Sequence, residues 1–224
     1  IIQGLVTEAS SLCYDSNGNL FVFGYNSAEG KAIIYKKEAG SADFNQFVEI
    51  DPWEYENERN SMASDGRGGV WIVSKFAGNT NDYGNFFHIN QGGDLDYHIK
   101  ITESQNIVLP THSNLPDGMP TNFYRGQLAY DAQRDILALG GNAKVTLFKV
   151  TYNQSGVPTL EYWQETPSLG DYTKAIDGIA FDYAGDLIVA SATTGFLYKY
   201  GLPTTNNVCT TPAPQIIPYR FVLQ

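Results

Sequence analysis

Apolar and polar positions along the chain follow a pattern that returns four times. Each copy holds a short apolar run, an aspartate, a turn and a second apolar run, and the aspartates are Asp15, Asp65, Asp131 and Asp182. These aspartates are 50, 66 and 51 residues apart. Periods of this length are typical of repeat architectures, so the pattern predicts a chain built from four related units.

Large and small side chains alternate within the apolar run before each aspartate. The residue three positions before the aspartate is large, and this set is Leu12, Met62, Leu128 and Ile179. The residue two positions before it is small, and this set is Cys13, Ala63, Ala129 and Ala180. A strand that is buried on both of its faces has such a composition, so each unit is predicted to begin with a buried strand.

A turn and further strands follow each aspartate. Three of the four turns contain a glycine, at Gly18, Gly68 and Gly185. An aspartate side chain can accept a hydrogen bond from the backbone two residues on, and glycine tolerates a positive φ. The second predicted strands are "LFVFG", "VWIVS", "ILALG" and "LIVAS", the third are "AIIYKK", "FFHIN", "VTLFKV" and "FLYKY", and the fourth are "QFVEI", "LDYHI" and "LEYWQ".

The predicted strands of each unit define an architecture. Four antiparallel strands that are repeated radially form the blades of a β-propeller, whereas a solenoid usually has shorter units and a sandwich need not repeat in sequence. We therefore expect an all-β fold, a β-propeller with four recognisable blade repeats. Most propellers have more blades, so a closed ring of four and part of a larger ring both remain open. The blade cores are expected near residues 10–50, 60–100, 125–165 and 176–200.

The fourth unit has no obvious fourth strand. We expect the propeller to occupy residues 1–202, and residues 203–224 to form an extended C-terminal tail or a closing strand. The missing strand could come from residues 1–8, from residues 215–224 or from outside the chain. The chain has no initiator Met and opens inside an apolar run, so we expect a processed or truncated product.

Composition supports a packed protein and argues against two kinds of partner. Hydrophobic residues make up 42% and aromatic residues 13% of the chain, which is enough to build a core. The net charge is −10 and only 14 residues are basic, whereas a nucleic-acid surface needs clustered Lys and Arg. No apolar run approaches the length of a membrane span. We therefore expect no nucleic-acid partner and no transmembrane segment.

The segment "DGIAFDYAGDLIVAS", residues 177–191, carries a family resemblance. Its order of Asp-Gly, an apolar residue, Asp, Gly and a second apolar run resembles the repeats of NHL-type and gluconolactonase/regucalcin-like propellers. The abundance of Tyr, Asn and Gly and the Thr- and Pro-rich tail are also similar to secreted bacterial surface propellers. The resemblance covers the four repeat cores, and it implies an extracytoplasmic location, whether secreted, periplasmic or on the cell surface.

The resemblance to the lactonase-like members of this family indicates where a metal site would lie in this chain. They hold a divalent metal over the central channel, and their ligands resemble a Glu/Asn/Asn/Asp set just before the innermost strands. The Asp lies in a "DGI"-like motif, matched here by Asp177-Gly178-Ile179. The equivalent positions, five residues before the repeat aspartates, are Ser10, Asn60, Gly126 and Asp177. We expect no cofactor; if a metal binds, Asn60 and Asp177 are its leading ligands and Ca²⁺ is the leading ion.

Loops between the predicted blades supply the remaining candidates for ligand binding. Their aromatic rings could stack on a sugar, their carboxylates could accept hydrogen bonds from its hydroxyls, and Arg125 could bind a carboxylate. The alternative is a set of solvated loops whose aromatics cover blade edges and whose arginine forms a salt bridge. With the two channel residues, the candidate set is Trp53, Tyr55, Glu58, Asn60, Tyr124, Arg125, Tyr172 and Asp177.

Candidates for catalysis are weak. His88, His98 and His112 have neither metal-ligand nor catalytic-triad spacing, and the first two fall on predicted strands. The chain contains no Gly-rich phosphate loop and no nucleophile elbow. Cys13 aligns with three alanines, which indicates a small buried thiol, although a disulfide with Cys209 in the tail remains open.

Three functional hypotheses follow from these features. The first is a non-catalytic, extracytoplasmic propeller module that binds a glycan, a peptide or a protein through its loop face, and the incomplete catalytic set favours it. The second is a metal-dependent, lactonase-like hydrolase with a site at the central channel, supported by Asn60 and Asp177. The third is a structural module of a larger surface protein. Metal bound at the channel mouth would separate the first two.

Overall fold

The computed structural model confirms the all-β prediction. It describes residues 8–26, 30–50, 60–75, 84–101, 107–108, 116–117, 119, 126–141, 144–169, 176–191, 194–203 and 215–217. Every regular element within these ranges is a β-strand. Accordingly, the described residues hold no helix that is long and apolar enough to cross a membrane.

The strands form four antiparallel sheets, which we call blades one to four. Blade one contains β1 (Glu8–Tyr14), β2 (Leu20–Asn26), β3 (Lys31–Lys37) and β4 (Asn45–Ile50), and blade two contains β5 (Ser61–Ser64), β6 (Val70–Lys75), β7 (Gly84–Ile89), β8 (Leu95–Ile101) and β9 (Ile107–Val108). Blade three contains β10 (Gln127–Asp131), β11 (Ile136–Gly141), β12 (Lys144–Tyr152) and β13 (Pro158–Glu165), and blade four contains β14 (Gly178–Phe181), β15 (Leu187–Ser191), β16 (Phe196–Tyr200) and β17 (Gln215–Ile217).

Two short strands complete the blades in different ways. β17 pairs antiparallel with β16 and is the fourth strand of blade four. It comes from the segment 215–224, which was one of the three sources open for that strand. β9 pairs with β8 and adds a fifth strand to the outer edge of blade two. The repeat pattern did not predict this strand, because among the described residues no other blade has a fifth strand.

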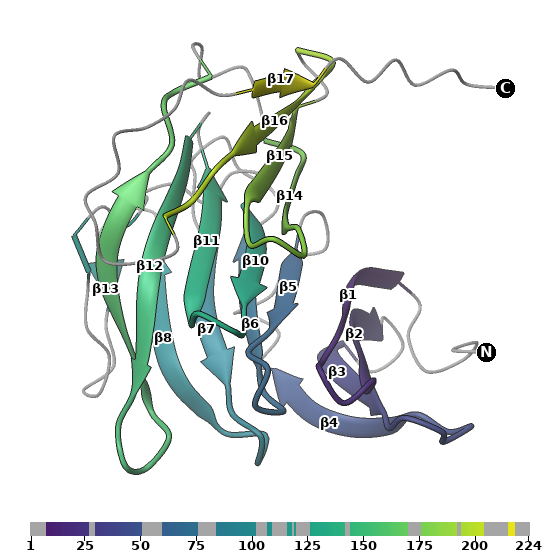
Figure 1. The fold of residues 1–224 in the computed structure, drawn as a ribbon. Helices are drawn as coiled ribbons and strands as arrows, with labels where there is room; N and C mark the ends of the chain where they lie inside the picture. Colours follow the sequence, from purple (N-terminus) through teal and green to yellow (C-terminus); the bar gives the residue numbers. More distant parts are fainter. Residues whose placement is uncertain are drawn as a thin grey trace, which may run out of the picture.

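The blades follow one another around the innermost strands (Figure 1). β1 packs beside β5, β5 beside β10, and β10 beside β14. The first strand of each repeat is therefore the innermost strand of its blade, and successive sheets face each other as the blades of a propeller do. This arrangement confirms the prediction of a β-propeller with four recognisable blades.

Each interface between neighbouring blades is a separate hydrophobic cluster. The clusters join blades one and two around Phe21 and Phe23, blades two and three around Trp71 and Phe86, and blades three and four around Leu147. The alternation of small and large residues in the sequence explains how they fit. The small residue of one blade packs in the same cluster as the large residue of the next, and the pairs are Cys13 with Met62, Ala63 with Leu128, and Ala129 with Ile179.

Cys13 occupies the small position of blade one. It is a free, partly buried thiol that packs against the cluster between blades one and two. Burial raises the pKa of Cys13 to about 12, and the nearby charge of Asp15 adds to the effect. The thiol is therefore protonated at neutral pH and contributes as a small apolar side chain. Cys209, the other cysteine, lies outside the described residues.

The repeat aspartates organise the turns between the first two strands of each blade, as predicted. The Oδ1 atom of Asp15 accepts hydrogen bonds from the backbone N–H groups of Asn17 and Asn19, at 2.9 and 2.8 Å. Asp65 and Asp182 bind their turns in the same way. Gly18, Gly68 and Gly185, at the equivalent position of these three turns, have a positive φ between 81° and 94°. Glycine adopts this conformation without steric cost.

The turn of blade three departs from this pattern, and its sequence explains why. Arg134 stands where the other turns have glycine, and the positive φ moves to the next residue, Asp135, at 52°. Aspartate is one of the few side chains that tolerate this conformation. The pairing shifts with it: Tyr130 pairs with Leu137, whereas Tyr14 of blade one pairs with Leu20.

Candidate functional site

Most of the predicted ligand-binding residues lie outside the described residues. These are Trp53, Tyr55, Glu58, Tyr124, Arg125 and Tyr172. Their role in binding stays a prediction. Asn60 and Asp177, the two candidates for the channel mouth, are described.

The structure brings together the first two channel-mouth positions. Asn60 is buried, and its Nδ2 donates a hydrogen bond to Oγ of Ser10 at 3.3 Å. The Ser10 hydroxyl donates in turn to the backbone oxygen of Phe23 at 3.3 Å. Asp177 is exposed just before β14, and its backbone N–H donates to the oxygen of Ala190 at 2.9 Å. Equivalent positions of blades one and two therefore meet, as repeat equivalence predicts.

These channel-mouth positions offer few side-chain oxygen ligands for a calcium ion. Ca²⁺ in proteins takes about six to eight oxygen ligands. Here the Ser10 hydroxyl is already engaged with Asn60 and Phe23, and Gly126 has no side chain. No group of three or more His, Cys, Asp or Glu residues suited to a metal occurs in the described part of the chain.

Calorimetry can test the expectation that calcium does not bind tightly. Chelator-treated protein titrated with CaCl₂ should show no micromolar site, because the four equivalent positions offer too few oxygen ligands. Asp177→Ala is the matched variant and should leave the heat signal and the melting temperature unchanged. A micromolar site in the wild type that is lost in Asp177→Ala would contradict this expectation and favour the lactonase-like hypothesis.

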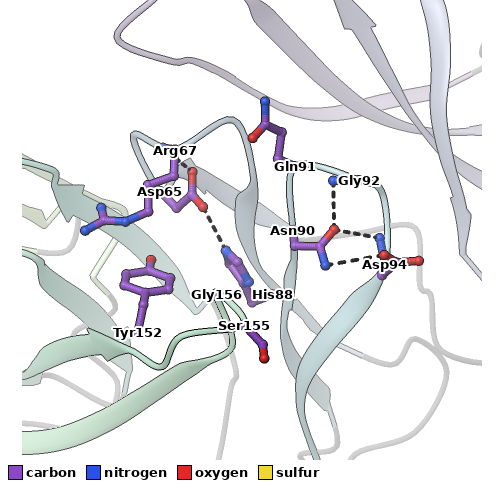
Figure 2. A pocket seen from close by; sticks show the side chains of 10 residues that line it. All are labelled: Asp65, Arg67, His88, Asn90, Gln91, Gly92, Asp94, Tyr152, Ser155 and Gly156. Carbon is purple, nitrogen blue, oxygen red and sulfur yellow. Dashed lines mark hydrogen bonds and ion pairs between the residues drawn. The ribbon is translucent and has the colours of Figure 1, made fainter.

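A second site lies between blades two and three, at the end where the repeat aspartates form their turns. Here the structure has a cavity of about 390 Å³ that is open to solvent (Figure 2). Three turns and the strand ends beside them contribute the lining residues. They are Asp65 and Arg67 before β6, His88, Asn90, Gln91, Gly92 and Asp94 at the β7–β8 turn, and Tyr152, Ser155 and Gly156 at the β12–β13 turn.

His88 and Asp65, which line this cavity, form a buried cluster with Asp96. The Nδ1 atom of His88 lies 2.6 Å from Oδ1 of Asp96, and its Nε2 atom lies 3.1 Å from Oδ2 of Asp65. All three side chains are buried, and His88 is 1% exposed. Two carboxylates on the two ring nitrogens favour the imidazolium form, because only that form donates from both nitrogens.

The pKa shifts agree with this assignment. Burial alone favours neutral His88, but its hydrogen bonds to Asp65 and Asp96 outweigh burial and raise its pKa above the ordinary 6.5. Burial likewise disfavours the charged form of Asp65. The hydrogen bond and the charge of His88, with the backbone N–H groups of Arg67 and Gly69, outweigh burial and lower the pKa of Asp65 below 3.8. The cluster is a buried ion pair with a second carboxylate attached.

The wall of the cavity belongs to the blade interface. Arg67 donates two hydrogen bonds to Asp135 of blade three, each at 3.0 Å. Its guanidinium also lies over the ring of Tyr152, 4.3 Å from the centroid. The hydroxyl of Tyr130 donates to Asp135 at 2.7 Å and lies 3.3 Å from the hydroxyl of Tyr152. Arg67 therefore joins the two blades through charge and through an aromatic face.

Hydrogen bonds within the protein hold the buried groups at the base of this cavity. Both nitrogens of His88 lie within hydrogen-bonding distance of a carboxylate, and both oxygens of Asp65 have a hydrogen-bond partner in the protein. The β7–β8 turn contributes Gln91 and Asp94 to the lining, and the β12–β13 turn contributes Ser155 and Gly156 (Figure 2). Such groups can donate or accept hydrogen bonds.

The fold defines this chain as a β-propeller protein. No sequence-family model and no curated protein matches it. Among solved structures, a luciferin-regenerating enzyme is 15% identical with a TM-score of 0.51, and the match covers 95% of this chain and 64% of that one. Hydrazine synthase of Kuenenia stuttgartiensis is 11% identical with a TM-score of 0.51, and the match covers 83% of this chain and 56% of that one.

A third similar structure is described as a calcium-binding protein, regucalcin, from Agrobacterium tumefaciens. It is 10% identical with a TM-score of 0.48, and the match covers 92% of this chain and 74% of that one. The chain thus spans less than two thirds of the length of the luciferin-regenerating enzyme and of hydrazine synthase. At these identities the two matches with a TM-score of 0.51 concern the fold alone, and they agree with the propeller predicted from the repeats.

Proposed function

We propose that this protein is a non-catalytic β-propeller module that binds a glycan, a peptide or a protein in an extracytoplasmic compartment. The cavity between blades two and three carries the proposal. Its volume of about 390 Å³ falls within the usual range for small-molecule sites, about 300–1,000 Å³. A neutral, hydroxyl-rich ligand fits its rim of amide, hydroxyl and carboxylate groups.

The engagement of the acid–base candidates supports a binding role. His98, the second buried histidine, has its Nε2 atom 2.9 Å from Oδ1 of Asn85. Together with the Asp65–His88–Asp96 cluster, this means that the described histidines stabilise strands of blade two. A general base must reach the proton that it removes, and these buried groups are turned toward the protein.

The binding test combines a screen with a variant that fills the cavity. The purified chain is applied to a glycan array and a peptide library, and the strongest hit is titrated by calorimetry. Ser155→Trp places an indole at the β12–β13 turn, and we expect it to weaken binding about ten-fold or more, which is about 1.4 kcal/mol.

Ala42→Trp is the matched control. Ala42 is exposed in the β3–β4 turn of blade one, which corresponds to the β12–β13 turn of blade three. Its substitution should leave the affinity unchanged. Equal affinities for the wild type and for Ser155→Trp would exclude the cavity as the site. Turnover of a bound glycan or lactone would reject the non-catalytic role.

A further inference from the structure

The second oxygen of each repeat aspartate has a side-chain donor, and the donor differs between the blades. Oδ1 accepts from the backbone of the turn in all four blades, and Oδ2 lies beside a side-chain nitrogen. The pairs are Asp15 with Asn19 at 2.8 Å, Asp65 with His88 at 3.1 Å, Asp131 with Arg134 at 2.5 Å, and Asp182 with Lys199 at 2.8 Å. An amide is uncharged, and arginine and lysine ordinarily keep their charge far above neutral pH, whereas imidazole ordinarily titrates at about 6.5. The turn of blade two is therefore the one whose side-chain donor can lose its charge near neutral pH.

A β-bulge holds His88 from its other side. The register of β7 and β8 shifts between His88 and Ile89, and Asp96 is the extra residue. Its Oδ1 atom lies 2.6 Å from Nδ1 of His88, and bulges commonly re-aim a side chain in this way. A neutral imidazole donates from only one nitrogen, so loss of the proton leaves one carboxylate without its hydrogen bond. The contact with Asp65 is the longer of the two, at 3.1 Å, so we expect Asp65 to lose its donor.

Asp65 links the imidazole to the turn and to the wall of the cavity. It is 2% exposed, and a buried charge without a partner is costly, so a carboxylate that loses its donor is driven toward water. The backbone N–H groups of Arg67 and Gly69 donate to its Oδ1 atom, so the turn moves with the carboxylate. Arg67 also contacts Asp135 and Tyr152 of blade three. A change at the imidazole therefore reaches the contact between the two blades beside the cavity.

The other titratable groups around this ion pair titrate far from the ordinary imidazole range. Burial raises the pKa of the Cys13 thiol to about 12, and likewise that of Tyr152, whose ring centroid lies 6.3 Å from that of His88. Burial also raises the pKa of Tyr97 and Tyr130 above the ordinary 10. A guanidinium keeps its charge, and carboxyl groups ordinarily titrate at about pH 4. The charged groups near the pair are Arg67, Asp65, Asp94, Asp96 and Asp135.

We propose that loss of the His88 proton releases the β5–β6 turn and opens the contact between blades two and three beside the cavity, so that ligand binding there depends on pH. Burial lowers the pKa of His88, but the hydrogen bonds to Asp65 and Asp96 outweigh burial and raise it above 6.5. The closed arrangement is therefore present below pH 6.5 and is lost as pH rises through the folded value. The effect on a ligand rests on the proposed function, whereas the movement of the turn does not.

Hydrogen exchange of the ligand-free protein, followed by NMR, tests the movement of the turn. The protection factors of the Arg67 and Gly69 N–H groups should fall about ten-fold or more between about pH 6 and pH 9, because local opening removes their protection. Blade four supplies a control within the same molecule. The N–H groups of Ala184 and Asp186 donate to Oδ1 of the aspartate whose other oxygen is bound by lysine, so their protection factors should stay constant. Constant protection of Arg67 and Gly69, or an equal fall in both turns, would overturn the proposal.

His88→Lys tests whether the imidazole is the group that titrates. His88 pairs with Trp71 as Lys199 pairs with Ile188, so the variant places the cation of blade four at the equivalent position of blade two. The Arg67 and Gly69 N–H groups should then keep their protection at both pH values. A fall in protection as large as that of the wild type would assign the effect to another group and overturn the proposal.

The ligand arm uses the strongest hit of the glycan array, which carries no charge that could titrate. Its affinity for the wild type should fall about ten-fold between about pH 6 and pH 9. An unchanged affinity, measured where the exchange of the turn does change, would overturn the dependence of binding on pH. If no glycan or peptide binds at either pH, the proposed function fails, while the exchange measurement still decides whether His88 controls the turn.

Discussion

Replacing His88 with alanine is expected to lower the free energy of unfolding by about 3–5 kcal/mol, which is typical when one partner of a buried ion pair is removed. Asp65 and Asp96 are 2% and 7% exposed, and both face the His88 ring. Without it, two buried carboxylates lose their shared cation, and the turn that Asp65 holds loses its neighbour. Urea denaturation followed by tryptophan fluorescence measures the loss.

The stability that this cluster contributes should depend on pH in a characteristic way. The raised pKa of His88 adds stability that is fully present below 6.5 and is lost as pH rises through the folded value. The lowered pKa of Asp65 adds stability that is present above 3.8 and is lost as pH falls through the folded value. The cluster therefore stabilises the fold most between these two ordinary values. In His88→Ala the pH dependence of stability should reverse on the acid side: stability should rise as pH falls, because protonation relieves the repulsion between the two carboxylates.

His98→Ala is the matched control for this experiment. His98 is also buried on blade two, but Oδ1 of Asn85, which lies beside its Nε2 atom, belongs to a neutral side chain. Loss of the His98 side chain should lower the free energy of unfolding by about 1–3 kcal/mol, the usual cost of leaving a buried polar group without its hydrogen bond. It should also lack the acid-side recovery expected of His88→Ala. Equal losses and equal pH profiles in the two variants would show that the charge cluster has no special role.

Trp71→Ala is expected to destabilise the protein by about 3–5 kcal/mol, as large aromatic deletions in cores do. Trp71 is fully buried between blades two and three, stacked on Phe86 with centroids 5.3 Å apart and edge-on to Tyr97 at 5.6 Å. It also covers the His88 ring at 4.5 Å. The deletion opens the largest side-chain volume in that interface and admits water to the ion pair.

Trp163 provides a control of the same residue type. It is partly buried on β13 and packs at the margin of the cluster between blades three and four. Trp163→Ala should lower the free energy of unfolding by about 1 kcal/mol, since Trp163 buries less apolar area than Trp71 does. Thermal unfolding by calorimetry compares the two variants. If Trp163→Ala destabilised the protein as much as Trp71→Ala, the interface between blades two and three would be no more sensitive to the loss of a tryptophan than the interface between blades three and four.

The fold was predictable from the turn residues and from the regular spacing of the repeats. The repeat aspartates and glycines set the turns. The alternation of Leu12 and Cys13 with their equivalents indicated strands buried on both faces, which is correct for β5 and β10 but wrong for β1 and β14, where Leu12 is 63% exposed and Ala180 is exposed. The register of blade three was not predictable, because it depends on Asp135 adopting a positive φ in the absence of glycine. β9 has only two residues, too few to leave a hydrophobic period.

The site required geometry that the sequence does not contain. A histidine inside the apolar run "FFHIN" indicates a buried polar group that must have a partner, and this signal could have drawn attention to His88. It does not say which carboxylate is the partner, because Asp94 and Asp96 are both near in sequence. The structure pairs Asp96, on β8, and adds Asp65 from a different turn.

The packing of a small residue in one blade against a large residue in the next governs how this sequence can evolve. An enlarged side chain at Ala63 requires a smaller one at Leu128, in the following repeat, because a filled interface does not tolerate added volume. Duplication or loss of a whole repeat keeps every small residue opposite a large one, whereas loss of half a repeat does not. Selection therefore couples positions about one repeat apart, while connecting loops vary in length, as the longer interval between Asp65 and Asp131 illustrates.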